Sequence, residues 1–138
     1  MKYLLDTNIC VYAMNGHMPV MRAMRQAGQD ALCISAVVLG ELAFGVARSA
    51  PTHRARNAAH LQQFTNALTV LPWSAQAAMH FGSERQRLRS AGAPIGEMDL
   101  LIGCHALAEG LTLVTHNTRE FARIDGLTLE NWVENLAA

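Results

Sequence analysis

Short apolar runs alternate along the chain with longer segments whose apolar residues recur at helical spacing. The apolar runs predict buried strands, at Tyr3–Leu5, Ala31–Ile34, Thr69–Leu71 and Leu111–Val114, with a short fifth within Leu127–Trp132. The periodic segments predict helices, at Thr7–Met14, Pro19–Ala27, Ala36–Ala47, Pro51–Leu68, Ala75–Ser90 and Glu97–Glu109. Such alternation predicts an α/β fold with three layers: a central, mostly parallel sheet of four to five strands and helices on both faces.

The composition fits one compact domain over residues 1–138. Hydrophobic residues make up 51% of the chain and charged residues 16%, which excludes a disordered protein. No repeat or linker-like Gly/Ser/Pro stretch divides it. Basic and acidic residues number 11 each, so no global basic field attracts nucleic acid.

All basic residues except Lys2 are arginines, which suit phosphate contact, although a GC-rich genome produces the same bias. Six of them are candidates for contact with a nucleic-acid backbone, and solvated helix faces are the plainer interpretation: Arg48, Arg54, Arg56, Arg85, Arg87 and Arg89. Cys10, Cys33 and Cys104 lie in apolar stretches and are expected to be reduced core residues. No targeting segment and no membrane-length apolar run is visible, so we expect a cytoplasmic protein without membrane contact.

Three carboxylates interrupt apolar segments. Asp6 directly follows the first strand, Glu41 lies among Val37, Val38 and Phe44, and Asp99 lies between Ile95 and Ile102. A buried, unpaired carboxylate costs several kcal/mol, and these three segments contain no Arg or Lys that could pair with the acids, up to Arg48. A divalent cation would compensate, and oxygen ligands suit Mg²⁺ or Mn²⁺. A helix cap or a partly exposed charge is the plainer interpretation of each acid taken alone.

Polar residues also follow the fourth strand. Thr115, Asn117 and Glu120 could orient a ligand, a water or a metal, and they equally suit a turn and a helix cap. The six histidines form no pair suited to acid–base cleavage of RNA, and His105 is expected to be a packed or capping residue.

Four motifs in order resemble the PIN-domain ribonucleases, and most closely the VapC toxins of bacterial toxin–antitoxin pairs. They are Leu4-Leu5-Asp6-Thr7-Asn8; Ile34-Ser35 with Glu41-Leu42; Ile95-Gly96 through Asp99; and Val114-Thr115 with Asn117 and Phe121. The resemblance implies a Mg²⁺-dependent endoribonuclease in which Asp6, Glu41 and Asp99 are catalytic and Asp6 and Asp99 hold the metal. Asn117 stands where the family often has a fourth acid, and Glu120 is near enough in sequence to replace it. Asn8, Ser35 and Thr115 match supporting polar positions.

The resemblance also implies a substrate and partners. The family hydrolyses RNA to leave a 3′-hydroxyl and a 5′-phosphate, and relatives of this type suggest tRNA cut in the anticodon loop, with initiator tRNA as the first choice. A VapB-type antitoxin and a homodimer are implied as well. Part of the antitoxin groove is expected in the methionine-rich stretch at Met14, Met18, Met21 and Met24.

Other classes fit less well. A phosphorelay receiver needs a late lysine, and the only lysine is Lys2. A haloacid-dehalogenase-type phosphatase needs a second Asp at the position of Asn8, and no GxGxxG follows the first strand. A PIN-like module that binds RNA or a partner without cutting stays open, because Asn117 brings no charge.

Overall fold

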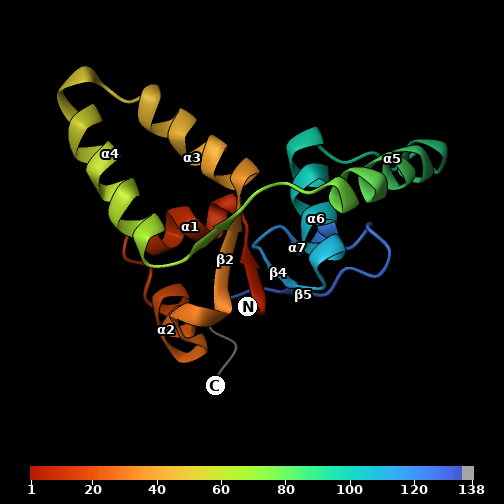
Figure 1. The fold of residues 1–138 in the computed structure, drawn as a ribbon, viewed down its shortest axis with the longest axis horizontal. Coiled ribbons are helices and arrows are strands. Elements are labelled where there is room, and N and C mark those ends of the chain that lie inside the picture. The colour runs from red at the N-terminus through yellow and green to blue at the C-terminus, as the bar shows by residue number, and fades with distance from the viewer. Residues whose placement is uncertain (135–138) are drawn as a thin grey trace.

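The computed structural model describes residues 1–134 and contains one five-stranded sheet (Figure 1). The strands are β1 (Tyr3–Leu5), β2 (Leu32–Ser35), β3 (Thr69–Leu71), β4 (Thr112–Val114) and β5 (Leu129–Glu130). They lie in the order β3-β2-β1-β4-β5, and every pairing is parallel. The α/β prediction is confirmed, and the sheet is wholly parallel.

The predicted helices are present with small changes at their ends. They are α1 (Thr7–Met14), α2 (Met18–Ala27), α3 (Ala36–Ala47), α4 (Pro51–Asn66), α5 (Ala75–Ser90) and α6 (Glu97–Glu109). A short 3₁₀ turn (Gln29–Ala31) and α7 (Thr118–Phe121) were not predicted from the sequence. Neither is long enough to show a helical period.

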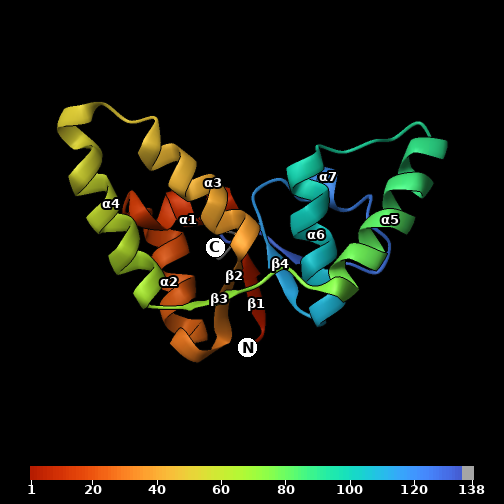
Figure 2. The ribbon, with the colours of Figure 1, turned by 45° about the horizontal axis from the view of Figure 1, so that its top comes forward.

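The strand order determines which helices share a face. The chain moves from β1 to β2 to β3 in one direction, then crosses to β4 and β5 on the other side of β1. Because parallel crossovers are right-handed, α1–α4 cover one face and α5–α7 cover the other. Figures 1 and 2 show these groups as two arms, with the α3–α4 hairpin on one side and α5 with α6 on the other.

The strands are apolar because they are buried on both faces. All four residues of β2 are buried, as are the last two residues of both β1 and β4. Gly103 allows α6 to lie close to the segment after α7, since a Cβ at this position would clash with Ile124 and press on Phe121. The three cysteines are free and buried, as expected. Within residues 1–134, no helix is long and apolar enough to cross a membrane.

Candidate active site

The strand order reverses between β1 and β4, because the connections that follow these two neighbouring strands run to opposite faces of the sheet. In a parallel sheet, such a point leaves a crevice outside the carboxyl ends of the strands, and the candidate site lies there. Leu5 pairs with Val114 at the ends of the two strands, so Asp6 and Thr115 are the next residues on each side. The two side chains are hydrogen-bonded, with the Thr115 hydroxyl donating to Asp6 Oδ2 at 2.7 Å.

Asp6 is held rigidly at this crevice. It caps α1, and its Oδ1 accepts the backbone N–H of Thr7 at 2.8 Å. The residue is only 4% exposed. Burial raises the pKa of Asp6, and the negative charges of Glu41 and Glu120 raise it further, while the hydrogen bonds from Thr115 and Thr7 oppose the shift. Asp6 is therefore well oriented, but its charged form is disfavoured by burial. A bound cation would stabilise that charged form.

Asp99 approaches the same crevice from the first turn of α6. Burial raises its pKa to about 6, with further contributions from Asp6, Glu120 and Glu41 in that order. Its side chain makes no hydrogen bond within residues 1–134. Asp6 at the end of β1, Glu41 of α3, Asp99 of α6 and Glu120 of α7 therefore face one region, although they are far apart in the sequence.

Glu41 reaches the crevice from the middle of α3. It is half-buried, and its Oε1 accepts the hydroxyl of Thr7 at 2.5 Å. Thr7 thus supports two acids, because its backbone binds Asp6 and its side chain binds Glu41. This role of Thr7 was not assigned from the sequence. Its place directly after Asp6 in the first motif was the available signal.

Glu120 of α7 is bonded to both Asn117 and Gly96. Its Oε2 accepts the amide of Asn117 at 2.9 Å, and its Oε1 accepts the backbone N–H of Gly96 at 3.0 Å. These two bonds hold the pKa of Glu120 below its usual range. Asn117 also donates its backbone N–H to the Thr115 hydroxyl at 3.0 Å. Asn117 therefore positions a neighbouring acid instead of supplying one.

Gly96 is the second residue that was missed in the sequence. A Cβ built at this position would lie 3.8 Å from Asp99 Oδ2 and 4.0 Å from Glu120 Oε1. The backbone of Gly96 therefore passes directly beside both carboxylates. Its place in the third motif, directly before a predicted helix, was the available signal, but no role was assigned to it.

Asn8 and Ser35, the other two residues expected to support the acids, accept hydrogen bonds from backbone N–H groups. Asn8 Oδ1 accepts the N–H of His116 at 3.4 Å, which links α1 to the segment after β4. Ser35 is fully buried and caps α3 through the N–H of Val37 at 3.1 Å. Within residues 1–134, neither side chain is hydrogen-bonded to Asp6, Glu41 or Asp99.

His105 is a packed residue, as expected. It is completely buried, and burial lowers its pKa, so the ring is neutral at physiological pH. Neither ring nitrogen has a hydrogen-bond partner in the described chain, and Glu109 Oε1 lies 3.9 Å from Nε2.

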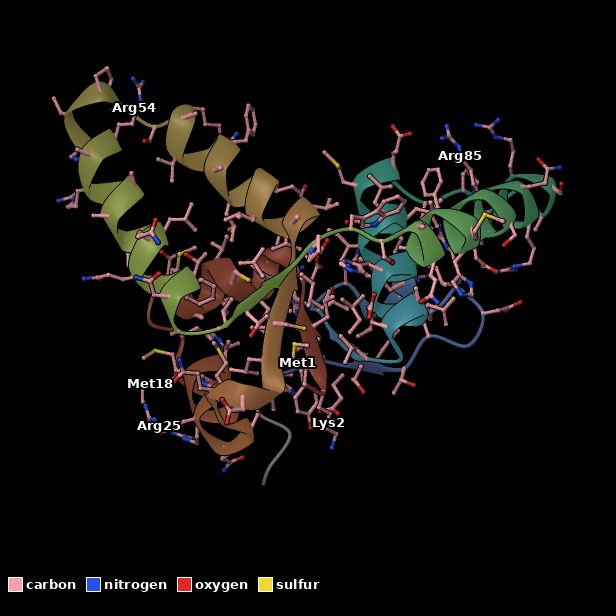
Figure 3. All side chains as sticks on the ribbon, viewed as in Figure 1. Met1, Lys2, Met18, Arg25, Arg54 and Arg85 are labelled. Atoms are coloured by element: carbon pink, nitrogen blue, oxygen red, sulfur yellow. The ribbon has the colours of Figure 1, made fainter. Side chains whose placement is uncertain are left out.

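The arginines considered for RNA contact lie on both arms. Figure 3 shows Arg54 at the tip of the α3–α4 hairpin and Arg85 on α5. The guanidinium of Arg87 is already engaged in an ion pair with Glu84 at 2.6 Å. Arg48 borders the same two hollows as Glu41. The six therefore do not form one patch, and Arg48 is the best placed of them.

The methionine-rich stretch is divided between surface and core. Met18 is 54% exposed, whereas Met14 and Met24 pack against the hydrophobic core. A different apolar surface lies nearer the acids. Phe44 and Met98 are 65% and 50% exposed, and they border a groove of about 740 Å³ between α3 and α6.

The donor set fits a magnesium ion that keeps part of its water shell. The converging ligands are carboxylate oxygens, which Mg²⁺ prefers. Among residues 1–134, no group of three or more His, Cys, Asp or Glu side chains is arranged so that it could hold a metal ion by itself. Mg²⁺ does not require one, since it is commonly held by one or two carboxylates, waters and substrate phosphate.

Comparison with known proteins defines the class of this fold and site. The family model of the PIN domain matches residues 3–127, which is most of the chain. The chain therefore belongs to the PIN-domain family.

Within that family, the similarity to VapC proteins covers nearly the whole chain. Ribonuclease VapC2 of Rickettsia felis is 42% identical over 134 residues, covering 96% of this chain and 98% of that protein. The tRNA(fMet)-specific endonuclease VapC of Shigella flexneri is 39% identical over 132 residues, with the same coverage.

Two solved structures share the fold. The structure of VapBC2 from Rickettsia felis bound to a promoter DNA fragment matches with a TM-score of 0.88 and 40% identity, covering 96% of this chain and 99% of that one. DNA-bound VapBC from Salmonella typhimurium matches with a TM-score of 0.89 and 36% identity, covering 96% and 98%.

Proposed function

We propose that the protein is a Mg²⁺-dependent endoribonuclease that acts as the toxin of a toxin–antitoxin pair. The observation that carries the proposal is the convergence of Asp6, Glu41 and Asp99 beside the carboxyl ends of β1 and β4. Burial raises the pKa of Asp6 and of Asp99, and the negative charge of Glu41 raises both further. Such a cluster destabilises the folded chain unless a cation compensates its charge, so acids in this arrangement are typical of a functional site.

Asp6 and Asp99 would hold the Mg²⁺ ion, or Mn²⁺ in its place. The ion would supply Lewis-acid stabilisation of the phosphate and a more acidic water. The Thr7 N–H and the Thr115 hydroxyl fix the orientation of Asp6. Glu41, steadied by the Thr7 hydroxyl, accepts the proton of the attacking water.

Glu120 completes the acidic cluster from the α7 side. Its bonds from Asn117 and Gly96 keep it ionised. Its charge would therefore attract the cation toward Asp99, which lies beside the same Gly96 backbone. Glu120 of α7 would thus supply the fourth negative charge that the uncharged Asn117 does not.

The substrate we propose is tRNA cut in a single-stranded loop, with the anticodon loop of initiator tRNA as the first choice. The support is the name of the Shigella flexneri relative, a tRNA(fMet)-specific endonuclease 39% identical to this chain. A loop can be splayed so that one phosphate reaches a recessed metal, whereas a duplex cannot. Such a substrate implies action in the cytoplasm.

A VapB-type antitoxin is the protein partner we propose, together with a homodimer of this chain. VapBC complexes with 36–40% identity share the fold. The exposed Phe44 and Met98 beside the acids support a protein partner, because such apolar surface usually marks an interface.

The deciding experiment is cleavage of total tRNA by the purified protein, free of antitoxin, with Mg²⁺ or with EDTA. Mg²⁺-dependent cuts in a few loops, mapped by primer extension and lost in Asp6→Asn, would support the proposal. Circular dichroism should show that this variant is folded. No cutting by folded protein would favour a PIN-like module that binds RNA or a partner without catalysis.

A further inference from the structure

A second hollow opens on the other side of Glu41. It has a volume of about 340 Å³ and lies between α1, α3 and α4. Thr7 and Glu41 line it, together with Asn57 and His60 of α4. The volume falls within the range of small-ligand pockets, roughly 300–1,000 Å³. The pocket is therefore large enough for one small ligand placed beside Glu41.

The lining combines apolar surface with uncommitted polar groups. Val11 and Met14 supply apolar contact, and Val11 is 42% exposed. Asn15, Asn57 and His60 supply hydrogen-bonding groups. None of these three side chains is hydrogen-bonded to another part of residues 1–134. Asparagine amides carry both donors and acceptors, so they can match the edge of a planar heterocycle whose faces pack on apolar side chains.

Arg48 links this pocket to the wider groove between α3 and α6, since it borders both. Its guanidinium stacks on Phe44 at 5.5 Å from the ring centre and makes no ion pair within the described chain. A cation at this junction is suited to a phosphate of a strand that passes from the groove into the pocket.

We propose that this pocket binds the base of a nucleotide next to the scissile phosphate, while Arg48 contacts the adjoining phosphate. The pocket would then select single-stranded RNA by base identity, because only an unpaired base can turn its edge toward Asn57 and His60. The inference rests on the proposed function for its class of substrate. The mixed polar lining favours a nucleotide here, whereas the apolar groove beyond Arg48 suits a protein.

The test uses binding in EDTA, so that it does not depend on cleavage. The probe is a fluorescent initiator-tRNA anticodon arm in which each loop base in turn is replaced by an abasic site. We expect one replacement to weaken binding to the wild type about 10-fold. Asn57→Leu and His60→Ala should weaken binding of the intact arm similarly and lose the response to that replacement. Asn66→Ala is the control, because Asn66 lies on α4, is bonded only to Gln62 and does not line the pocket.

The outcomes separate this inference from the proposed nuclease activity. If Asn57→Leu and His60→Ala respond to abasic sites as the wild type does, the pocket proposal is wrong even if the protein cuts tRNA. If they lose the response and the wild type does not cut in Mg²⁺, the pocket stands and the nuclease proposal fails. If the variants lose only affinity for a VapB-type antitoxin, the pocket is a protein site and the inference is overturned.

Discussion

Asp6 and Asp99 face the same crevice but are held in different ways. Asp6 accepts two hydrogen bonds, caps a helix and is almost fully buried. Asp99 is half-buried and accepts none within the described chain, and its pKa is raised to about 6. The hydrogen bonds of Asp6 therefore stabilise the folded state, whereas the ionised carboxylate of Asp99 destabilises it in the absence of a cation. Loss of the two carboxylates should have similar effects on catalysis and opposite effects on stability.

The largest effect should be on cleavage. If the proposed function is right, Asp6→Asn and Asp99→Asn should each lower kcat/KM for tRNA by about 10²–10³-fold, because each removes a negative charge proposed to bind the cation. Single-turnover cleavage of labelled tRNA at several Mg²⁺ concentrations would measure this loss. Cleavage by Asp99→Asn at the wild-type rate would show that the two acids are not equivalent and would remove Asp99 from the metal site.

Stability should then separate the two acids. Asp6→Ala leaves the Thr7 N–H and the Thr115 hydroxyl without their acceptor, and should lower the free energy of unfolding by about 1–3 kcal/mol. Asp6→Asn is the matched control, since asparagine keeps a capping oxygen. Urea unfolding without metal would measure both. Equal stability of the alanine and asparagine variants would contradict the structural role of Asp6.

Asn117→Ala tests the α7 side of the site. Without the amide, Glu120 keeps only the Gly96 N–H, so its charge is less well oriented toward the cation. We expect metal affinity to fall about 10-fold, as when other supporting residues of metal sites are removed. Calorimetric titration with Mn²⁺ would measure it, with Asn131→Ala as a control at another asparagine. A 10-fold loss in the control as well would show that the effect is not specific to Glu120.

The smallest effect concerns pH. The pKa of Asp99 is higher in the folded state than its unfolded value of 3.8, so the folded protein binds more protons between about pH 4 and 6. Stability without metal should therefore fall as pH rises through this range. Asp99→Asn should remove part of the fall and gain about 1 kcal/mol at pH 7, or about 3 °C in Tm, after allowance for solvent screening. Melting curves at several pH values would show it, and Mg²⁺ should raise the Tm of the wild type alone.

The sequence predicts the fold well because its signals are local. Each strand is a continuous apolar run, since both faces of the sheet are covered, and capping residues such as Ser35 and Ser74 mark where helices begin. The acids could be found because they break this pattern. Their site roles remain predictions, although the structure brings Asp6, Glu41 and Asp99 to one crevice.

The supporting contacts could not be predicted in the same way. Thr7 binds Glu41 across 34 positions, and Glu120 binds Gly96 across 24. Neither pairing has a periodic signal, because each depends on how two helices approach one another. The hydrogen bond from Asn117 to Glu120 depends on α7, a single turn of helix that the sequence pattern does not reveal.

The bond between Asp6 and Thr115 joins positions 109 residues apart, and this has a consequence for synthesis of the protein. A ribosome-bound chain that ends before β4 already carries Asp6, Glu41 and Asp99, but it has neither Thr115 nor Glu120 to arrange them. The crevice forms only after β4 inserts beside β1. If the proposed function is right, an unfinished chain should therefore not cleave RNA, and the site should be complete only when synthesis has passed β4 and α7.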